Sequence, residues 1–217
     1  MNSIQKIKQK YREQIDLLDL ELIISRVIKK PREFVIIHPE HKIIKNYGLR
    51  ITDYIKRRIN GEPIAYIFGE KEFYGLNFKV NKNTLVPRPE TELLIELAIE
   101  YIRNPKSEIR NPIIIDVGTG SGCIIITLAK ILNSKCQIPN SKFIATDISV
   151  PALRTARQNA KLHKVDKKIK FLQGNLLEPI INSTSCKLKD TSYIILANLP
   201  YLAPSQIKNS PSIQREP

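Results

Sequence analysis

The segment 113–122 constrains the fold of this chain more than any other stretch. It opens with the three isoleucines of 113–115, and such a run of β-branched residues predicts a strand that is buried on both faces. The strand ends near Asp116, and a turn follows in which every second residue is glycine, at Gly118, Gly120 and Gly122. Residues 123–132 are apolar and numerous enough for a helix. Strand, glycine turn and helix form the first half of a βαβ unit, so we expect an α/β protein.

The glycine turn is also a candidate ligand site, because glycine lets the backbone adopt positive φ and approach a ligand closely. The dinucleotide pattern GxGxxG does not fit, since the third glycine comes one residue early. The spacing DxGxGxG resembles instead the first motif of class I S-adenosylmethionine-dependent methyltransferases. The resemblance implies that the turn binds this cofactor through Gly118, Thr119, Gly120, Ser121 and Gly122. The alternative is a glycine-rich turn that binds no ligand.

The composition is that of a water-soluble globular protein. The chain has 217 residues, of which 42% are hydrophobic and 26% charged, so it is long enough for one large domain or two small ones. It contains no apolar run of about eighteen residues and no apolar segment near its N-terminus, so we expect neither a membrane span nor a secretory signal. Its three cysteines lack CxxC spacing, which indicates a reducing cytoplasm rather than a disulfide framework or a zinc site.

The net charge of +14 permits two interpretations. A polyanionic partner such as RNA or the ribosome would account for it. A lysine-rich codon usage would also account for it, and the abundance of Ile, Lys and Asn agrees with that. The lysines are scattered rather than clustered with aromatic residues, which favours the second interpretation.

Residues 1–60 predict a bundle of four or five short helices. Apolar residues recur at steps of three and four, with a break near 16–19, at Ile4, Ile7, Tyr11, Ile15, Leu18 and Leu22. Pro31 ends the second helical segment, and 47–59 again shows helical spacing. His38 and His41 flank Pro39 with no third ligand nearby, so we predict no metal site. We interpret the bundle as a substrate-docking module or a packing element.

Residues 61–92 predict a β-hairpin and then an extended segment that opens a helix. Apolar and polar residues alternate around a turn at 74–75. Two prolines flank Arg88 and hold the chain extended, and Glu90 or Thr91 is placed to cap the helix 92–102. The apolar face expected for that helix consists of Leu93, Leu94, Leu97 and Ile102. Arg88 is either a ligand contact or one half of a structural ion pair.

The same region identifies a family. The sequence EPIAYIFGEKEFYGLNFKVNKNTLVPRPETELLIE resembles the segment that joins the two domains of the release factor glutamine methyltransferases, the PrmC/HemK family. The resemblance implies an N-terminal helical docking domain over 1–72, a β-hairpin linker over 73–86 and a methyltransferase domain over 87–217.

Asp147 is the next candidate cofactor residue. It ends a predicted strand over 143–147 and lies 25 residues beyond Gly122, near the spacing at which an acid meets a ribose. The alternative is an N-cap for the helix 150–162, and both roles hold if Ser149 caps that helix instead. A third strand is expected over 170–175. The family usually carries an acid where Asn175 stands, and the resemblance implies that Leu176 lies against the adenine.

A fourth predicted strand, 193–197, leads into Asn198, Leu199, Pro200 and Tyr201. This segment resembles the (N/D)PPY motif of methyltransferases that act on planar nitrogens. An amide nitrogen is a poor nucleophile, so the Asn198 side-chain oxygen and a backbone carbonyl near Pro200 would each accept one N–H and orient it. Tyr201 would pack on the planar substrate. Leu199 replaces the usual proline, but Pro200 still restricts it to extended conformations.

The predicted core is incomplete at its C-terminus. Glu216-Pro217 matches an EP dipeptide that follows the (N/D)PPY loop in the family, whose sheet then continues. Only the first four strands are present, so we expect the last of them to have an unpaired apolar edge. The chain is then a fragment of a longer protein or the product of a split or decaying gene.

By resemblance, the predicted function is N5-methylation of the glutamine in the GGQ motif of class 1 peptide chain release factors, with S-adenosyl-L-methionine as the methyl donor. The resemblance implies catalytic roles for Asn198, Pro200 and Tyr201. The same three residues and Leu199 would bind the substrate, and Asn198 would also contact the cofactor. No metal, membrane or nucleic acid is required. The alternatives are a nucleic-acid adenine-N6 methyltransferase, which the charge favours but the linker does not, and an inactive truncated remnant.

Overall fold

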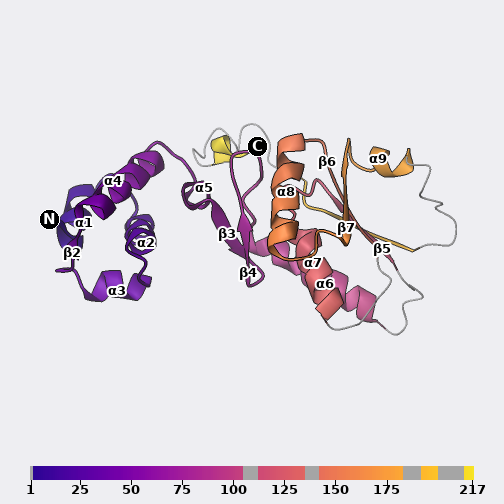
Figure 1. Cartoon of the computed structure of the whole chain (residues 1–217), viewed down its shortest axis with the longest axis horizontal. Coiled ribbons are helices and arrows are strands. Elements are labelled where there is room, and N and C mark those ends of the chain that lie inside the picture. The colour runs from indigo at the N-terminus through magenta and orange to yellow at the C-terminus, as the bar shows by residue number, and fades with distance from the viewer. Residues whose placement is uncertain (1, 105–111, 135–141, 183–191, 200–212) are drawn as a thin grey trace. The chain divides into compact units, whose positions relative to one another are not determined.

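The computed structural model describes residues 2–104, 112–134, 142–182, 192–199 and 213–217. The chain divides into two compact units, one comprising Met1–Phe68 with Pro211–Arg215 and the other Gly69–Ser210 with Glu216–Pro217. Figure 1 identifies the elements of each unit. The assignment of 1–72, 73–86 and 87–217 to docking, linker and catalytic roles stays a prediction.

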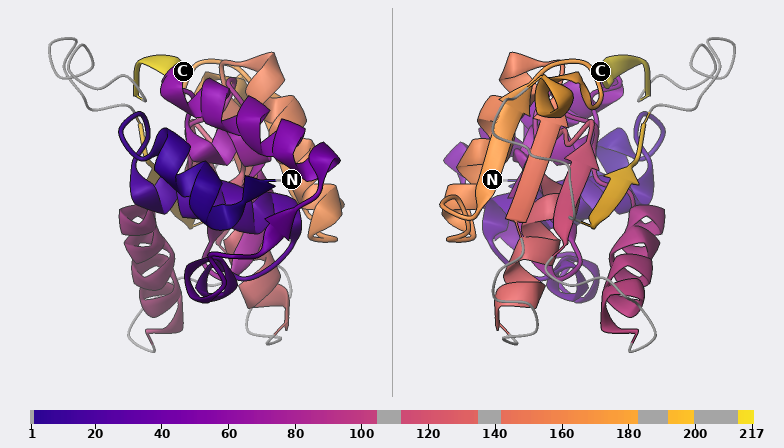
Figure 2. Two further views of the ribbon diagram at one scale, coloured as in Figure 1. Left: turned by 90° about the vertical axis from the view of Figure 1, so that its left-hand side faces the viewer. Right: turned by 90° about the vertical axis from the view of Figure 1, so that its right-hand side faces the viewer.

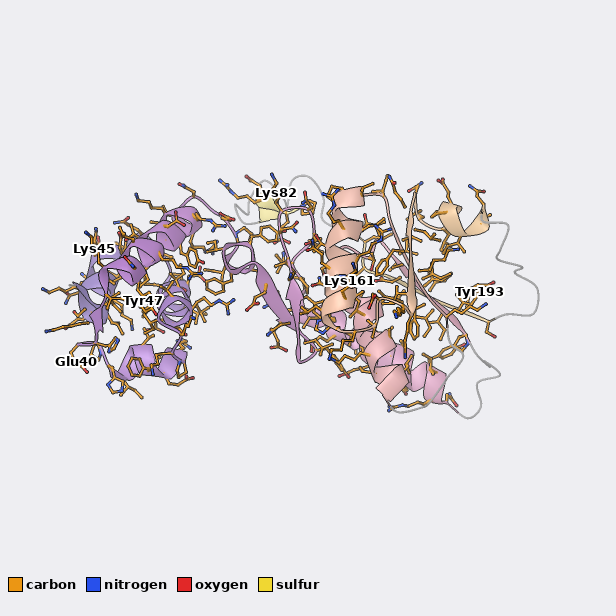
Figure 3. The ribbon with its side chains drawn as sticks, viewed as in Figure 1. Glu40, Lys45, Tyr47, Lys82, Lys161 and Tyr193 are labelled. Carbon is orange, nitrogen blue, oxygen red and sulfur yellow. The ribbon has the colours of Figure 1, made fainter. Side chains whose placement is uncertain are left out.

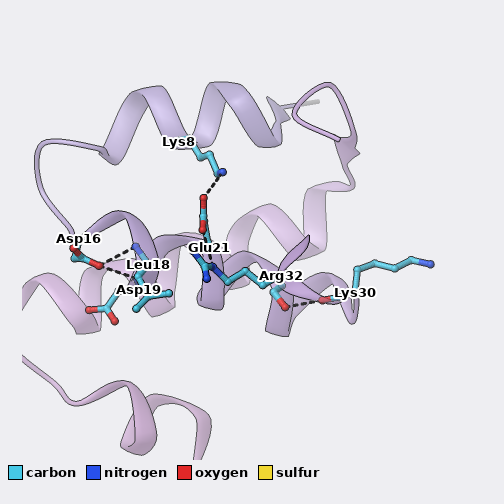
Figure 4. Close-up of polar contacts among 8 residues, drawn as sticks. Lys8, Asp16, Leu18, Asp19, Glu21, Lys30 and Arg32 are labelled. Carbon is cyan, nitrogen blue, oxygen red and sulfur yellow. Dashed lines mark hydrogen bonds and ion pairs between the residues drawn. The ribbon is translucent and has the colours of Figure 1, made fainter. Parts of the chain in front are cut away.

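The first unit is helical, as the sequence predicts. Its elements are β1 (Asn2–Ser3), α1 (Ile4–Tyr11), α2 (Leu17–Ile28), α3 (Arg32–Ile37), β2 (Lys42–Ile43), α4 (Lys45–Ile59), α5 (Ile64–Phe68) and the 3₁₀ turn η2 (Ile213–Arg215). Asp16 caps α2 by accepting hydrogen bonds from the backbone N–H groups of Leu18 and Asp19 (Figure 4), which accounts for the predicted break. The prediction that Leu18 joins the buried face is wrong, because this first-turn side chain is exposed.

A buried carboxylate ties three helical segments of this unit together. Glu21 on α2 is 4% exposed and accepts hydrogen bonds from Lys8 at 2.7 Å and from Arg32 at 2.8 Å (Figure 4). Burial by itself raises the pKa of Glu21, but the hydrogen bonds and charges of Lys8 and Arg32 outweigh burial, so the pKa lies below its usual range. His38 and His41, the two histidines considered as metal ligands, contact the ring of Phe34.

The second unit begins with the predicted hairpin. Strands β3 (Glu70–Phe73) and β4 (Leu76–Lys79) pair antiparallel, with Phe73 opposite Leu76. Tyr74 and Gly75 both have positive φ, the requirement of a two-residue type I′ turn. The hairpin is therefore confirmed, although its first strand starts earlier than the linker prediction placed it.

The extended segment then leads through the 3₁₀ turn η1 (Pro89–Thr91) into α6 (Glu92–Arg103). The start of this helix is confirmed, and its predicted face is confirmed in part, because Leu94 and Ile102 pack against the core. Leu93 and Leu97 are exposed, and α6 buries Ile95, Ala98 and Ile99 instead. Apolar residues occupy most positions of α6, so packing rather than periodicity selects the buried side.

A four-stranded parallel sheet forms the centre of the second unit and confirms the α/β prediction. Its strands are β5 (Ile113–Val117), β6 (Lys142–Asp147), β7 (Ile169–Gln173) and β8 (Tyr193–Ala197), in the order β7-β6-β5-β8. The helices that follow the first three strands are α7 (Cys123–Ser134), α8 (Val150–Leu162) and α9 (Glu178–Ile181). Among the described residues β8 is an edge strand (Figure 2), and its Ile195 is half exposed, as the prediction of an apolar edge requires.

Both faces of β5 are covered. Ile114 belongs to a core that contains side chains of α6, α7, α8 and the hairpin. Ile113 and Ile115 point into a second, smaller core with Ile144 and with Ile180 of α9. Figure 3 shows side chains of this unit gathered on both sides of the sheet. Alternate residues of β5 therefore fill different cores, which explains why every residue of the strand except Asp116 is apolar. Among the helices that the structure describes, none is both long and apolar enough to cross a membrane.

Candidate active site

The glycine turn, Asp147 and Asn198 lie at the switch point of the sheet. From β5 the chain adds β6 and β7 on one side and then returns to add β8 on the other. β5 lies between β6 and β8, with Val117 opposite Thr146 on one side and Ala197 on the other. All three strands run parallel, so the glycine turn after β5, Asp147 at the end of β6 and Asn198 after β8 lie at one edge of the sheet. In open α/β sheets, this carboxyl edge at the switch point is where ligands bind.

The glycine turn is packed against helices at Gly122 and has free space next to its backbone at Gly120. Gly122 has a φ of 81°, and a Cβ there would lie 2.7 Å from Ile126 Cδ1 and 3.2 Å from Ala156 Cβ. Gly120 has a φ of 55°, but a Cβ there would meet no atom within 4 Å. Gly122 is thus needed to pack the turn on α8, whereas Gly120 leaves room over the backbone. The side chains of Thr119 and Ser121 are buried, so the turn presents backbone to a ligand.

Asp147 holds the turn in place. Its Oδ2 accepts the backbone N–H of Gly120 at 2.8 Å, and its Oδ1 accepts that of Ser149 at 2.8 Å. Ser149 caps α8 by accepting the N–H of Ala152, so the prediction that Ser149 is the cap is confirmed. Each carboxylate oxygen has capacity for a further hydrogen bond, so the two contacts leave Asp147 able to accept from ribose hydroxyls.

Asp116 lies beneath the turn and was not among the predicted site residues. It is 1% exposed, and its Oδ2 accepts a hydrogen bond from Thr119 Oγ1 at 2.6 Å. Its Oδ1 has no hydrogen-bond partner among the described residues. Burial raises the pKa of Asp116 to about 7, and the charge of Asp147 acts in the same direction, while the bond from Thr119 opposes them. An acid next to the last position of an otherwise apolar strand was the sequence signal for this residue.

Asn198 and Leu199 leave β8 beside the glycine turn. Asn198 Nδ2 donates a hydrogen bond to Thr91 Oγ1 at 3.0 Å. A Cβ on Gly118 would lie 2.8 Å from Leu199 Cδ2, so Leu199 covers the start of the turn. The structure therefore brings Asn198 and Leu199, the first two residues of the segment that resembles (N/D)PPY, next to the turn. Pro200 and Tyr201 lie outside the described residues.

Leu176 follows β7, the strand that pairs with β6 on the side opposite to β5. It has a φ of 46° and a half-exposed side chain. Gly174, two residues before Leu176, donates its N–H to the carbonyl of Asp147 at 3.1 Å, which places the loop after β7 near the end of β6. Asn175 donates to Glu178 at 3.4 Å, at the start of α9. The contact of Leu176 with an adenine stays a prediction.

Arg88 forms the ion pair that the sequence left as one of two possibilities. Its guanidinium lies 2.6 Å from Glu216 Oε1, and Glu216 Oε2 accepts the backbone N–H of Val86 at 3.1 Å. The Glu216 side chain is 3% exposed. The segment before α6 is thus joined to the EP dipeptide.

Comparison with known proteins agrees with this architecture. Residues 4–69 match the family described as PrmC N-terminal domain, and residues 110–204 match a methyltransferase domain family. The chain is 36% identical to a release factor glutamine methyltransferase of Coxiella burnetii over 92% of its own length and 65% of the relative's. It is 35% identical to that of Nitratidesulfovibrio vulgaris over 87% of its length and 58% of the relative's. It is 32% identical to a bifunctional methyltransferase of Rickettsia bellii over 90% of its length and 38% of the relative's.

The chain thus spans between 38 and 65% of the lengths of these relatives. Within that span, the match to the PrmC N-terminal domain comes first and the match to the methyltransferase domain, which contains the parallel sheet, comes second. The segment that resembles the family's linker lies between the cores of these two matches. The chain belongs to the release factor glutamine methyltransferase family, PrmC/HemK.

Proposed function

We propose that this protein methylates the side-chain amide nitrogen of the glutamine in the GGQ motif of class 1 peptide chain release factors. One observation carries the proposal: the parallel pairing of β5 with β8 sets Asn198 beside the glycine turn, with Leu199 over Gly118. A motif that orients a planar nitrogen is thereby adjacent to a turn suited to a cofactor. The family relationship supports the choice of a glutamine amide as substrate.

S-adenosyl-L-methionine fits the residues at the turn. The open space above Gly120 admits a ligand close to the backbone, and the Asp147 carboxylate lies at the next strand end. When bound, this cofactor supplies a methyl group on a positively charged sulfur. Gly118, Thr119, Gly120, Ser121 and Gly122 would hold it through the backbone, Asp147 would bind its ribose, and Leu176 would contact its adenine.

The chain's own part in the reaction is to orient the amide. Asn198 Oδ1 would accept one N–H of the substrate glutamine, and a backbone carbonyl near Pro200 would accept the other. Tyr201 would pack against the amide plane. These contacts fix the nitrogen toward the methyl donor, and the proton that the nitrogen loses passes to solvent.

The partner, location and domain roles follow from the same proposal. Class 1 release factors are the protein partner, and the cytoplasm, where translation ends, is the compartment. Residues 1–72 would dock the release factor, 73–86 would link the domains and 87–217 would carry the chemistry. The charge of +14 is the observation that favours a second candidate, methylation of adenine N6 in a nucleic acid.

The test is transfer of labelled methyl groups from S-adenosylmethionine to a purified class 1 release factor, followed by mass-spectrometric mapping of the label. Wild-type protein is compared with Asn198→Ala and with Asn182→Ala, an exposed asparagine at the end of α9. We expect label on the GGQ glutamine with wild type and Asn182→Ala and none with Asn198→Ala. A release factor with GGA in place of GGQ should stay unlabelled. Label on adenine-containing nucleic acid, and none on the release factor, would replace the proposal with the second candidate.

A further inference from the structure

Thr91 occupies the N-cap position of α6, but its side chain does not cap the helix. The backbone there is already helical, with φ −70° and ψ −18°, and the Thr91 side chain makes no cap hydrogen bond. The polar cap residues Ser3, Asp16 and Ser149 all accept backbone N–H groups in the usual way. Thr91 therefore has the predicted N-cap position but not the predicted capping hydrogen bond, and its hydroxyl binds another partner.

That partner is Asn198, which lies 107 residues further along the chain. Thr91 is 7% exposed, and its Oγ1 accepts a hydrogen bond from Asn198 Nδ2 at 3.0 Å. An asparagine amide has a donor end and an acceptor end of nearly the same shape, so a rotation of 180° exchanges them. Because Thr91 engages the nitrogen, the oxygen is directed away from Thr91.

The segment that carries Thr91 is fixed at several points. The backbone N–H of Thr91 donates to the carbonyl of Arg88, and the Arg88 guanidinium is paired with the buried Glu216. On the other side, Glu92 accepts the backbone N–H of Tyr74 at 2.9 Å, in the hairpin turn. Thr91 is thus a constrained support for Asn198 rather than a mobile surface side chain.

We propose that Thr91 is a positioning residue whose hydroxyl anchors the nitrogen end of the Asn198 amide, so that Oδ1 faces the substrate. The inference rests on the proposed function, in which this oxygen accepts an N–H of the reacting amide. With the amide reversed, Asn198 would present N–H groups to the N–H groups of the substrate. The hydroxyl of Thr91 is then needed for rate, although it does not touch the reacting atoms.

The test compares Thr91→Val, which keeps the shape and removes the hydroxyl, with Thr91→Ser, which keeps the hydroxyl. Loss of one hydrogen bond to a neutral group should lower kcat roughly 3- to 30-fold in Thr91→Val, with little change in the KM for S-adenosylmethionine. Thr91→Ser should restore most of the rate. In the Asn198→Ala background Thr91→Val should have no further effect, because the group that it positions is gone.

The chain offers a matched control. Thr155 on α8 is also a buried threonine whose Oγ1 accepts an asparagine amide, that of Asn81, at 3.0 Å. Thr155→Val removes this hydrogen bond, and also the one that Thr155 Oγ1 donates to the Pro151 carbonyl at 3.3 Å, at a site away from Asn198. We expect it to lower the unfolding temperature at least as much as Thr91→Val does, and to leave kcat within about twofold of wild type.

A spectroscopic measurement reports the hydrogen bond of the Asn198 amide nitrogen. In ¹⁵N NMR spectra, the side-chain NH₂ of Asn198 should exchange slowly with water in wild type and in Thr91→Ser, and rapidly in Thr91→Val. If wild type is active and Thr91→Val is equally fast, the positioning role is wrong while the proposed function stands. If correctly folded wild type transfers no methyl group to release factors, the proposed function fails and the inference fails with it.

Discussion

Asn159 on α8 joins the hairpin to the glycine turn through a single buried amide. Its Oδ1 accepts the backbone N–H of Lys79 at 2.7 Å, and its Nδ2 donates to the carbonyl of Lys79 at 2.9 Å. The same Nδ2 donates to the carbonyl of Ser121 at 2.8 Å. The Asn159 side chain is fully buried, so β4, α8 and the turn share one set of hydrogen bonds through an amide that water does not reach.

Replacing Asn159 with alanine should therefore destabilise the second unit. The variant leaves the backbone groups of Lys79 and the carbonyl of Ser121 buried without their partner, and we expect a loss of roughly 2–4 kcal/mol in the free energy of unfolding. Urea unfolding measures this loss, and hydrogen exchange of the β4 amides shows whether it is felt in the hairpin. Gln158→Ala, at the exposed neighbouring position on α8, is the matched control and should change stability by less than about 0.5 kcal/mol. Equal stability of the two variants would contradict this account of the contact.

Gly120 and Gly122 should respond to alanine in opposite ways. At Gly122 the added Cβ meets Ile126 and Ala156 within the packed core, so we expect a loss of stability of about 2–3 kcal/mol. At Gly120 the Cβ enters open space and only the positive φ is strained, so the loss should be about 1 kcal/mol. The Gly120 variant should nevertheless bind S-adenosylmethionine at least tenfold more weakly, because the Cβ occupies the space proposed for the ligand.

Calorimetric titration with S-adenosylmethionine and denaturant unfolding separate these two effects. Gly48→Ala is the control, since this helical glycine in α4 has open space around it, and the substitution should stabilise the protein by about 0.5–1 kcal/mol. If Gly120→Ala binds the cofactor as tightly as wild type, the ligand does not lie above the turn.

These contrasts show which parts of the site could be read from the sequence. The strand 113–117 and the glycine turn carry local signals, a run of isoleucine and a fixed glycine spacing, and both were predicted. Ser149 as the cap of α8 was also recognisable, because capping depends on neighbours only three residues away.

The errors and omissions involve contacts between distant residues. Thr91 was expected to cap α6, but its hydroxyl bonds an amide 107 residues away. Asn159 carries no local signal at all, since its partners lie 80 and 38 residues away. In α6, apolar residues cover most of the helix outside the stripe of Glu92, Glu96 and Glu100, so the choice of Ile95 over Leu93 as a core residue depended on where the sheet and α7 lie. Such outcomes are decided by tertiary packing, which overrides local pattern.

Asp116 should make stability depend on pH in an unusual direction. Its pKa is about 7 in the folded protein, above the ordinary value of 3.8, so between these pH values the native state holds a proton that the unfolded state has lost. The free energy of unfolding therefore falls as pH rises from about 4 to about 7, by at most roughly 4 kcal/mol from this group. Asp116→Asn removes the ionisation and keeps an oxygen for Thr119 Oγ1.

Denaturant unfolding of wild type and Asp116→Asn across pH 4–8 measures this effect. The variant should gain stability relative to wild type as pH rises, and the difference should level off above about pH 7. Other groups titrate equally in both proteins, so they cancel in the comparison. A difference that is constant across the range would show that Asp116 is ionised throughout.

Glu21 should give the opposite dependence in the first unit. Its pKa is lowered by Lys8 and Arg32 despite its burial, so its contribution is fully present above the unfolded-state pKa near 4.5 and is lost as pH falls through the lower folded-state pKa. Glu21→Gln keeps the shape but removes the charge that pairs with both cations. We expect a loss of about 1–3 kcal/mol at pH 7 that shrinks as the pH is lowered below 4.

Hydrogen exchange of α1 and α2 amides reports the stability of this unit directly. Glu13→Gln is the matched control, because Glu13 is exposed and its ion pair with Arg12 spans 3.6 Å between side chains that face water. It should change the exchange rates of α1 and α2 little at any pH. If Glu21→Gln matches Glu13→Gln at pH 7, the contacts to Lys8 and Arg32 do no more than offset the desolvation of Glu21, and the carboxylate adds no net stability to the helical unit.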